Sequence, residues 1–203
     1  MKDEFIKIFK ENIHREGADA LLAWLEKSDF FTAPASSKYH ANYEGGLCVH
    51  SVNVYKRLLV IFQTESANDP TAYAAYAEAL AICALLHDLC KVNYYKKIWS
   101  NVKVYAEGGS RHDEGGDFDW HTVPGYAVED KLPYGHGEKS VYMISGFMKL
   151  SRDEAMAIRW HMGATDNNGG DSAKAFRSYF LPLRLHIADL QATFIDEKES
   201  APA

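Results

Sequence analysis

Long apolar runs, low-complexity tracts and an excess of positive charge are all missing from this chain of 203 residues. Its longest unbroken apolar run, Ala79–Leu86, is far shorter than the roughly 20 residues that a membrane-spanning helix needs. Its formal net charge of −6 gives no overall attraction to nucleic acid or to anionic membranes. We therefore expect no membrane partner. The net charge does not exclude a local basic groove that binds nucleic acid.

Cysteine is also scarce. The chain has three cysteines, Cys48, Cys83 and Cys90. Their odd number and the lack of a CxxC spacing exclude a simple disulfide framework or zinc knuckle. We interpret them as reduced core thiols. The charged start, Met1–Glu4, does not have the pattern of a signal peptide. Together these features predict a cytoplasmic protein.

The composition, 47% hydrophobic and 25% charged, is typical of a globular domain with a full core. The length favours a single domain over residues 1–203. Periodicity predicts a mainly α fold, a helical bundle. The expected helical segments are two helices in 2–28, one over 47–64, one from Asp69-Pro70 to His87-Asp88, helices resuming at about Glu138, one capped by Ser151 and Glu154, and one restarted by Pro182.

Residues 92–137 form an expected insertion with a small antiparallel sheet around 100–130. Segments Asn101–Tyr105 and Phe118–Val123 are rich in β-formers, and Tyr126–Asp130 is a candidate third strand. The insertion can be a lid, a substrate wall or decoration, and the sequence does not choose among them. Residues 197–203 are expected to form a frayed tail.

The stretch Leu80–Asn93 organises the rest of the chain. It is apolar on every side of the expected helix and ends in adjacent His87 and Asp88. A helix that is apolar all round is buried, and an aspartate is rarely buried without a partner or a cation. The pair either caps a core helix or binds a metal ion.

Other imidazole and carboxylate groups share this inward orientation. Burying so many of them is costly unless they share metal ions. One or two divalent ions, Mn, Fe, Co, Ni, Zn or Mg, suit such a set, and we expect the cysteines to stay outside it. The predicted metal ligands are His50, His87, Asp88, His136, His161 and Asp189.

The order His … His-Asp … His … His … Asp resembles the HD-domain superfamily of metal-dependent phosphohydrolases. The segment Ala35–Val54, which contains Gly45-Gly46 before His50, looks like the HD domains of certain 3′→5′ exoribonucleases and of small stand-alone bacterial and phage hydrolases. Cys90 stands where many members have glycine. The resemblance implies an HD-domain helical bundle.

The resemblance also implies roles for these residues. His50, His87, Asp88 and Asp189 match a first metal site, whereas His136 and His161 match the second site of binuclear members, with Asp88 bridging. Lys91 matches the lysine that meets a phosphate oxygen or the leaving group, so Asp88 and Lys91 are the implied catalytic residues.

The implied activity is hydrolysis of a phosphoester or phosphoanhydride of a nucleotide or short oligonucleotide by a metal-activated water. Weaker substrate-binding candidates are Tyr39, His40, Lys139 and Arg159. Two alternatives remain: a di-iron oxygenase on the same ligand set, and a non-catalytic binding module that metal stabilises. The oligomeric state stays open, with a homodimer through the N-terminal helices as one alternative.

Overall fold

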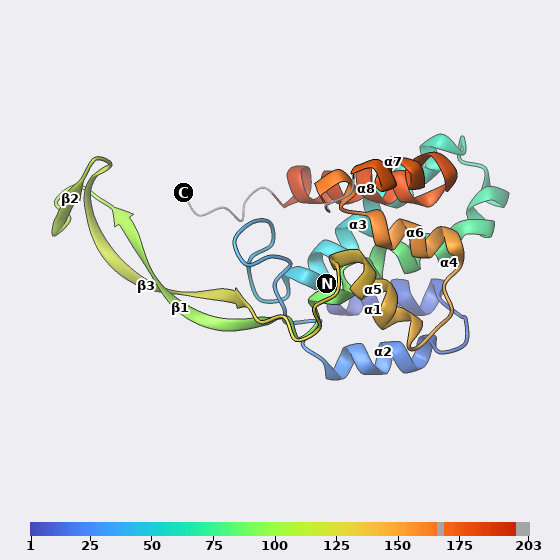
Figure 1. Cartoon of the computed structure of the whole chain (residues 1–203), viewed down its shortest axis with the longest axis horizontal. Coiled ribbons are helices and arrows are strands. Elements are labelled where there is room, and N and C mark those ends of the chain that lie inside the picture. Colours follow the sequence, from blue (N-terminus) through green and yellow to red (C-terminus); the bar gives the residue numbers. More distant parts are fainter. Residues whose placement is uncertain (166–168, 198–203) are drawn as a thin grey trace.

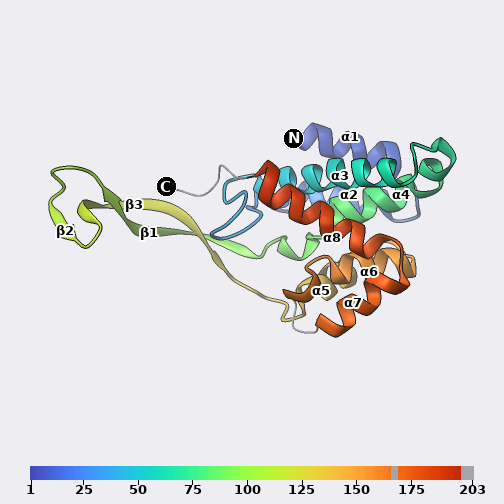
Figure 2. The same ribbon diagram turned by 90° about the horizontal axis from the view of Figure 1, so that it is seen from above.

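The structure is a computed structural model that describes residues 1–165 and 169–197. Within them the chain is mainly helical, with eight α-helices and a three-stranded antiparallel sheet inserted between the fourth and fifth (Figure 1). The predicted fold class is therefore confirmed. The helices pack into one body, and the sheet projects from it as a long arm, as the view turned by 90° also shows (Figure 2).

The first half of the helical body follows the predicted segments closely. Phe5 and Phe9 lie one turn apart on the first helix and are fully buried, as the apolar spacing predicts. Asp69 caps the fourth helix, because its carboxylate accepts a hydrogen bond from the Thr71 amide at 2.9 Å. The four helices are α1 (Lys2–Asn12), α2 (Ala18–Lys27), α3 (Gly46–Glu65) and α4 (Pro70–Leu86).

Helix α4 is the centre of the core. Every residue from Leu80 to Leu86 is buried, with no exposed face. By length and composition the 22 residues Pro70–Lys91 would suffice to cross a membrane, but 61% of their most apolar stretch is buried inside the protein. Their apolar character is thus explained by packing against the surrounding helices.

The second half of the body contains α5 (His136–Ser145), α6 (Arg152–Trp160), α7 (Gly169–Ser178) and α8 (Leu181–Gln191), and a π-helical turn, Ala192–Asp196, extends α8. The predicted capping box is present, with Ser151 accepting from the Glu154 amide and Glu154 accepting from the Ser151 amide. Such a cap stabilises a helix by about 1 kcal/mol.

Two close contacts hold the helices that carry the predicted ligands. Arg15 donates to Glu78 of α4 and to the buried Glu154 of α6, and so ties the turn after α1 to both helices. Gly137 of α5 packs against the backbone of Arg159 in α6, where a Cβ atom would collide with the Arg159 carbonyl. Because Gly137 has no side chain, the first turn of α5 lies directly next to the last turn of α6.

The arm consists of β1 (Tyr95–Tyr105), β2 (Arg111–Asp113) and β3 (Gly116–Val128), in the spatial order β1-β3-β2. All of β1 pairs with β3, from Tyr95 opposite Val128 to Tyr105 opposite Phe118. The prediction of a third strand at Tyr126–Asp130 was wrong. Residues 126–128 continue β3, and the short third strand precedes it, because the turn at Glu114-Gly115 folds Arg111–Asp113 back onto β3.

Candidate metal centre

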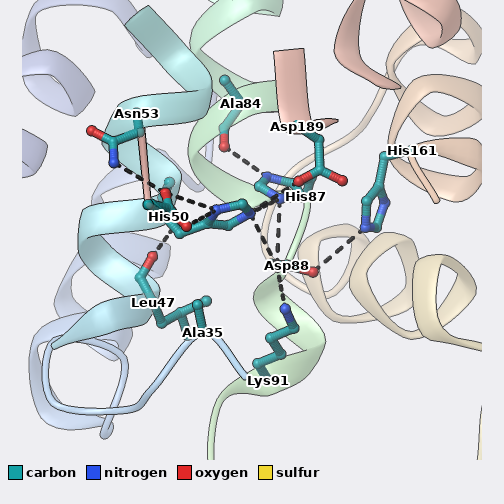
Figure 3. Close-up of polar contacts among 12 residues, drawn as sticks. Ala35, Leu47, His50, Asn53, Ala84, His87, Asp88, Lys91, His161 and Asp189 are labelled. Carbon is teal, nitrogen blue, oxygen red and sulfur yellow. Dashed lines mark hydrogen bonds and ion pairs between the residues drawn. The ribbon is translucent and has the colours of Figure 1, made fainter. Parts of the chain in front are cut away.

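The six predicted ligands, the first and last of which are 139 positions apart in the chain, come together in the core. Four lie at helix ends: His87 and Asp88 directly follow α4, His136 begins α5, and His161 directly follows α6. His50 projects from the second turn of α3, and Asp189 projects from the last turn of α8 (Figure 3). His50, His87, Asp88 and His161 are at most 2% exposed.

Asp88 is the hub of this cluster, and its two oxygens face different partners. Oδ1 lies 2.8 Å from Nε2 of His136 and 3.5 Å from Nε2 of His161. Oδ2 lies 3.5 Å from Nε2 of His87 and 3.7 Å from Nε2 of His50. The carboxylate thus stands between two pairs of imidazoles, the geometry of a ligand that can serve two adjacent ions. The surrounding cations and hydrogen bonds outweigh the burial that would raise the pKa of Asp88, and they hold it well below its usual range.

His87 and His161 have their tautomers fixed by the backbone. Nδ1 of His87 lies 2.9 Å from the Ala84 carbonyl, and Nδ1 of His161 lies 2.7 Å from the Ile158 carbonyl. A carbonyl oxygen can only accept a hydrogen bond, so each Nδ1 carries the proton. In the neutral imidazole each Nε2 therefore presents a lone pair to the centre, which is the arrangement of metal-binding histidines.

His50 is held by carboxylates on both sides of its ring. Its Nε2 lies 3.1 Å from Asp189, and its Nδ1 lies 3.1 Å from Glu197. Burial lowers the pKa of His50, but the hydrogen bonds to these carboxylates outweigh it and raise the pKa to about 9. Asn53, one turn further along α3, donates to Glu197 at 3.0 Å and fixes its orientation.

His136 lies between Asp88 and a thiol. Nδ1 of His136 is 3.3 Å from Sγ of Cys90, and the ring is half-buried at the mouth of the cluster. Burial lowers the pKa of His136, but Cys90 and Asp88 raise it to about 9. The expectation that the cysteines stay outside the cluster was wrong for Cys90, because the turn after α4 directs its side chain to the same side as Asp88.

The donor set fits a metal ion. Nε2 of His161 is buried and makes no hydrogen bond with any described residue, although it points at Asp88. Nε2 of His87 faces Nε2 of His50 at 3.2 Å, and that nitrogen of His50 also pairs with Asp189. Once His50 has lost its proton, a divalent cation would engage the Nε2 lone pairs of all three histidines. The buried groups that can hold one are His50, His87 and Asp189; His87, Asp88 and His161; Asp88, Cys90 and His136; and His40, His50 and Glu197.

Lys91 supplies a buried cation next to the cluster. Its Nζ lies 2.6 Å from Oδ2 of Asp88, and Figure 3 shows the side chain reaching back from the turn after α4 toward that oxygen. Burial alone lowers the pKa of Lys91, but Asp88 outweighs it and raises the pKa above its usual range. Lys91 is therefore a fixed positive charge at the edge of the centre.

A cavity of about 740 Å³ opens onto the cluster from the side of the arm. Asp88, Lys91 and His136 lie in its wall, as does Tyr95 at the base of the arm. A space of this size accommodates a small organic ligand such as a nucleotide. The other lining groups include Ser36, His40, Tyr94, His186 and Glu197.

The weaker substrate-binding candidates lie in different places, and only some of them line the cavity of the metal centre. His40 lies against His50 with ring centroids 4.8 Å apart, and burial lowers its pKa to about 4, so it is a neutral imidazole in the cavity wall. Tyr39 lines the same cavity with its side chain mostly exposed. Lys139 instead pairs with Asp130 at 2.5 Å and lies over the ring of Tyr94.

Arg159 lines a different cavity, of about 810 Å³, between α5, α6 and α7. There it pairs with Glu138 and stacks on Trp160 with 3.9 Å to the ring centroid. The structure thus brings Tyr39 and His40 to the metal centre and places Arg159 apart from it.

Glu197 and Cys90 are members of the site that the sequence analysis missed. Glu197 was expected at the start of a frayed tail, and that was wrong: it is buried and contacts His50, while residues 198–203 lie outside the described part of the chain. Its spacing was a usable signal, since a residue eight positions after Asp189 returns to the same side of a helix. Cys90 had a weaker signal, its position two residues after Asp88.

Comparison of the chain with protein-family models, with curated protein sequences and with solved structures finds no match. The chemistry of the site therefore has to be argued from its own geometry.

Proposed function

We propose that this protein is a metal-dependent phosphohydrolase of the HD type that acts on a nucleotide or short oligonucleotide. The observation that carries the proposal is the position of Asp88, which contacts imidazoles through both oxygens while Lys91 stands 2.6 Å away at the cavity wall. A ligand set with an adjacent fixed cation and an open cavity is the arrangement that phosphate-ester hydrolysis needs.

The ligands divide into two groups around Asp88. His50, His87 and Asp189 would hold one ion on the Oδ2 side, and His136 and His161 would hold a second ion on the Oδ1 side. Bound there, Mn, Fe, Co, Ni, Zn or Mg would polarise a phosphoryl oxygen and lower the pKa of a water molecule. The nearby Cys90 thiol favours the softer ions of this series over Mg.

The chain's own residues would bind and orient the substrate. Lys91 keeps its positive charge at neutral pH and would meet a non-bridging phosphate oxygen or the leaving group. The neutral His40 can donate or accept a hydrogen bond in the cavity without adding charge. Tyr39 and Tyr94 offer ring faces for a nucleobase.

The direct test is a hydrolysis panel on protein purified without chelator. Mono-, di-, tri- and cyclic nucleotides and short oligonucleotides are incubated with added Mn²⁺, and product is measured for the wild type and for Asp88→Ala. We expect hydrolysis of at least one class, lost in the variant. Retention of full activity by Asp88→Ala would exclude the proposal.

Two other outcomes would select the alternatives. Bound iron with oxygen consumption and without phosphate-ester hydrolysis would indicate a di-iron oxygenase. A fall in thermal stability of Asp88→Ala without turnover of any substrate by the wild type would indicate a metal-stabilised binding module.

A further inference from the structure

The β1–β3 arm has two faces of different chemistry. Side chains alternate along a strand, so Tyr95, every second residue up to Tyr105, and their partners from Val128 back to Phe118 project to one side. We call this side the aromatic face. Five of the six residue pairs on this face include at least one aromatic ring, from one strand or the other.

Rings on this face are exposed to solvent. Trp99 is 74% exposed, Tyr105 50% and Trp120 47%. In the described part of the chain no helix or second sheet packs against these rings. A two-stranded ribbon by itself buries few of its own side chains. Large aromatic groups kept in water at regular spacing form a surface suited to stacking ligands.

Positive charges are interleaved with the rings. Within Tyr95–Tyr105 and Gly116–Val128 the aromatic face has Lys97 and Lys103 but no aspartate or glutamate, whereas Asp117 and Asp119 project to the other side. Lys103 lies over the ring of Phe118, 4.5 Å from its centroid.

A carboxylate pairs with each of these lysines, closely for Lys103 and in an exposed pair for Lys97. Lys97 pairs with Glu44 at 3.0 Å, and Lys103 pairs with Asp113 of β2. The Lys97 pair is well exposed on both sides, and such pairs contribute little stability, so a phosphate group can replace the carboxylate.

The aromatic face leads directly into the cavity of the metal centre. Tyr95 and Val128, the pair at its inner end, both line that cavity, and Tyr95 donates to the Ala35 carbonyl at 3.4 Å. From Tyr95 to Tyr105 the face spans roughly 33 Å at about 3.3 Å per residue. An extended ligand lying on the arm would thus present one end to Asp88 and Lys91.

We propose that the aromatic face binds single-stranded nucleic acid, stacking bases on Trp99 and Trp120 and placing phosphates against Lys97 and Lys103, with one end of the strand in the cavity. The proposal rests on the proposed hydrolase function and narrows its substrate class to single-stranded oligonucleotides. Alternating rings and cations are the features by which proteins bind single strands without reading their sequence.

The test is fluorescence anisotropy with labelled 12-nucleotide oligo(dT) and oligo(U), using the full chain in EDTA so that the probe stays intact. We expect binding that weakens from 50 to 200 mM salt. Trp99→Ala and Trp120→Ala should each weaken it by about 5- to 150-fold, the range for loss of one stacked base. Lys97→Ala should weaken it, whereas Lys96→Ala, the adjacent lysine on the opposite face, should not.

Hydrolysis of a small ester, thymidine 5′-(p-nitrophenyl) phosphate, separates this proposal from the hydrolase function. The arm variants should keep that activity. Ester hydrolysis without oligonucleotide binding would overturn only the proposal about the arm. Oligonucleotide binding through the arm without any hydrolysis would overturn only the proposal that the protein is a hydrolase. A wild-type dimer that Trp99→Ala converts to a monomer, with no oligonucleotide bound, would assign the face to a second copy of the chain and overturn the proposal.

Discussion

Nε2 of His136 lies 2.8 Å from Oδ1 of Asp88, although 48 residues separate the two in sequence. The whole arm is inserted between them, so the chain leaves the metal centre after α4 and returns to it at the first residue of α5. The arm is therefore anchored at both ends to the cluster that we propose to be catalytic.

Loss of the Asp88 charge should destabilise the protein as well as inactivate it. Asp88→Asn keeps the shape of the side chain but leaves the buried Lys91 cation without its carboxylate, and breaking a buried pair costs about 3–5 kcal/mol. Urea unfolding of metal-free protein measures this. The double variant Asp88→Asn/Lys91→Met should recover part of the loss, and no recovery would show that the pair is not coupled.

Glu197 should control metal affinity through His50. Glu197→Gln removes the carboxylate that holds Nδ1 of His50, and loss of such an outer partner typically weakens metal binding by about 10- to 100-fold. The adjacent Asp196 pairs with Arg57 instead, so Asp196→Asn is a matched control that should leave affinity unchanged. Equal affinities for the two variants, measured by calorimetry, would contradict this role.

Metal binding should strengthen as the pH rises toward 9. In metal-free protein the pKa values of His50 and His136 are raised to about 9, so both rings are protonated at neutral pH and must lose a proton to become ligands. Protons are therefore released on binding, and calorimetry in buffers of different ionisation enthalpy counts them. An affinity that is constant between pH 7 and 9 would exclude these histidines as ligands.

Cys90 should bias the centre toward softer ions. Its Sγ lies 3.3 Å from His136, and a thiolate prefers Zn, Co or Fe to Mg. Cys90→Ser should therefore weaken Zn²⁺ or Co²⁺ binding more than Mg²⁺ binding. Cys48→Ala, a buried cysteine of α3, provides the control for general effects of losing a thiol. A parallel loss for all three ions would mean that the thiol is not a ligand.

Much of the fold was predictable from the sequence because its local signals agree with the tertiary structure. Asp69-Pro70 starts α4, Ser151 and Glu154 cap α6, and the apolar stretch before His87 is the buried core. Five of the six predicted ligands lie on or directly after an apolar helical face, and His136 begins α5 after a loop with glycine on both sides of it. These are local patterns, which sequence reasoning handles well.

The remainder depends on contacts that no local pattern encodes. The third strand of the arm forms because the turn at Glu114-Gly115 pairs Arg111–Asp113 with β3, and its three residues are too few to show a period. Arg159 was a candidate by charge and position, but Glu138 and Trp160 draw it to another cavity. The helical spacing of Glu197 from Asp189 predicts a side chain that faces the core. It does not identify the partner of Glu197, because His50 is 147 residues away in the chain.

The central claim is that the cluster around Asp88 binds metal, and the most direct measurement is the metal content of protein purified without chelator. Inductively coupled plasma mass spectrometry should find one or two divalent ions per chain in the wild type and a clear loss in His87→Ala and Asp88→Asn. A folded wild-type protein that carries no metal, and takes up none when titrated with Mn²⁺, Fe²⁺, Co²⁺, Ni²⁺, Zn²⁺ or Mg²⁺, would contradict the account.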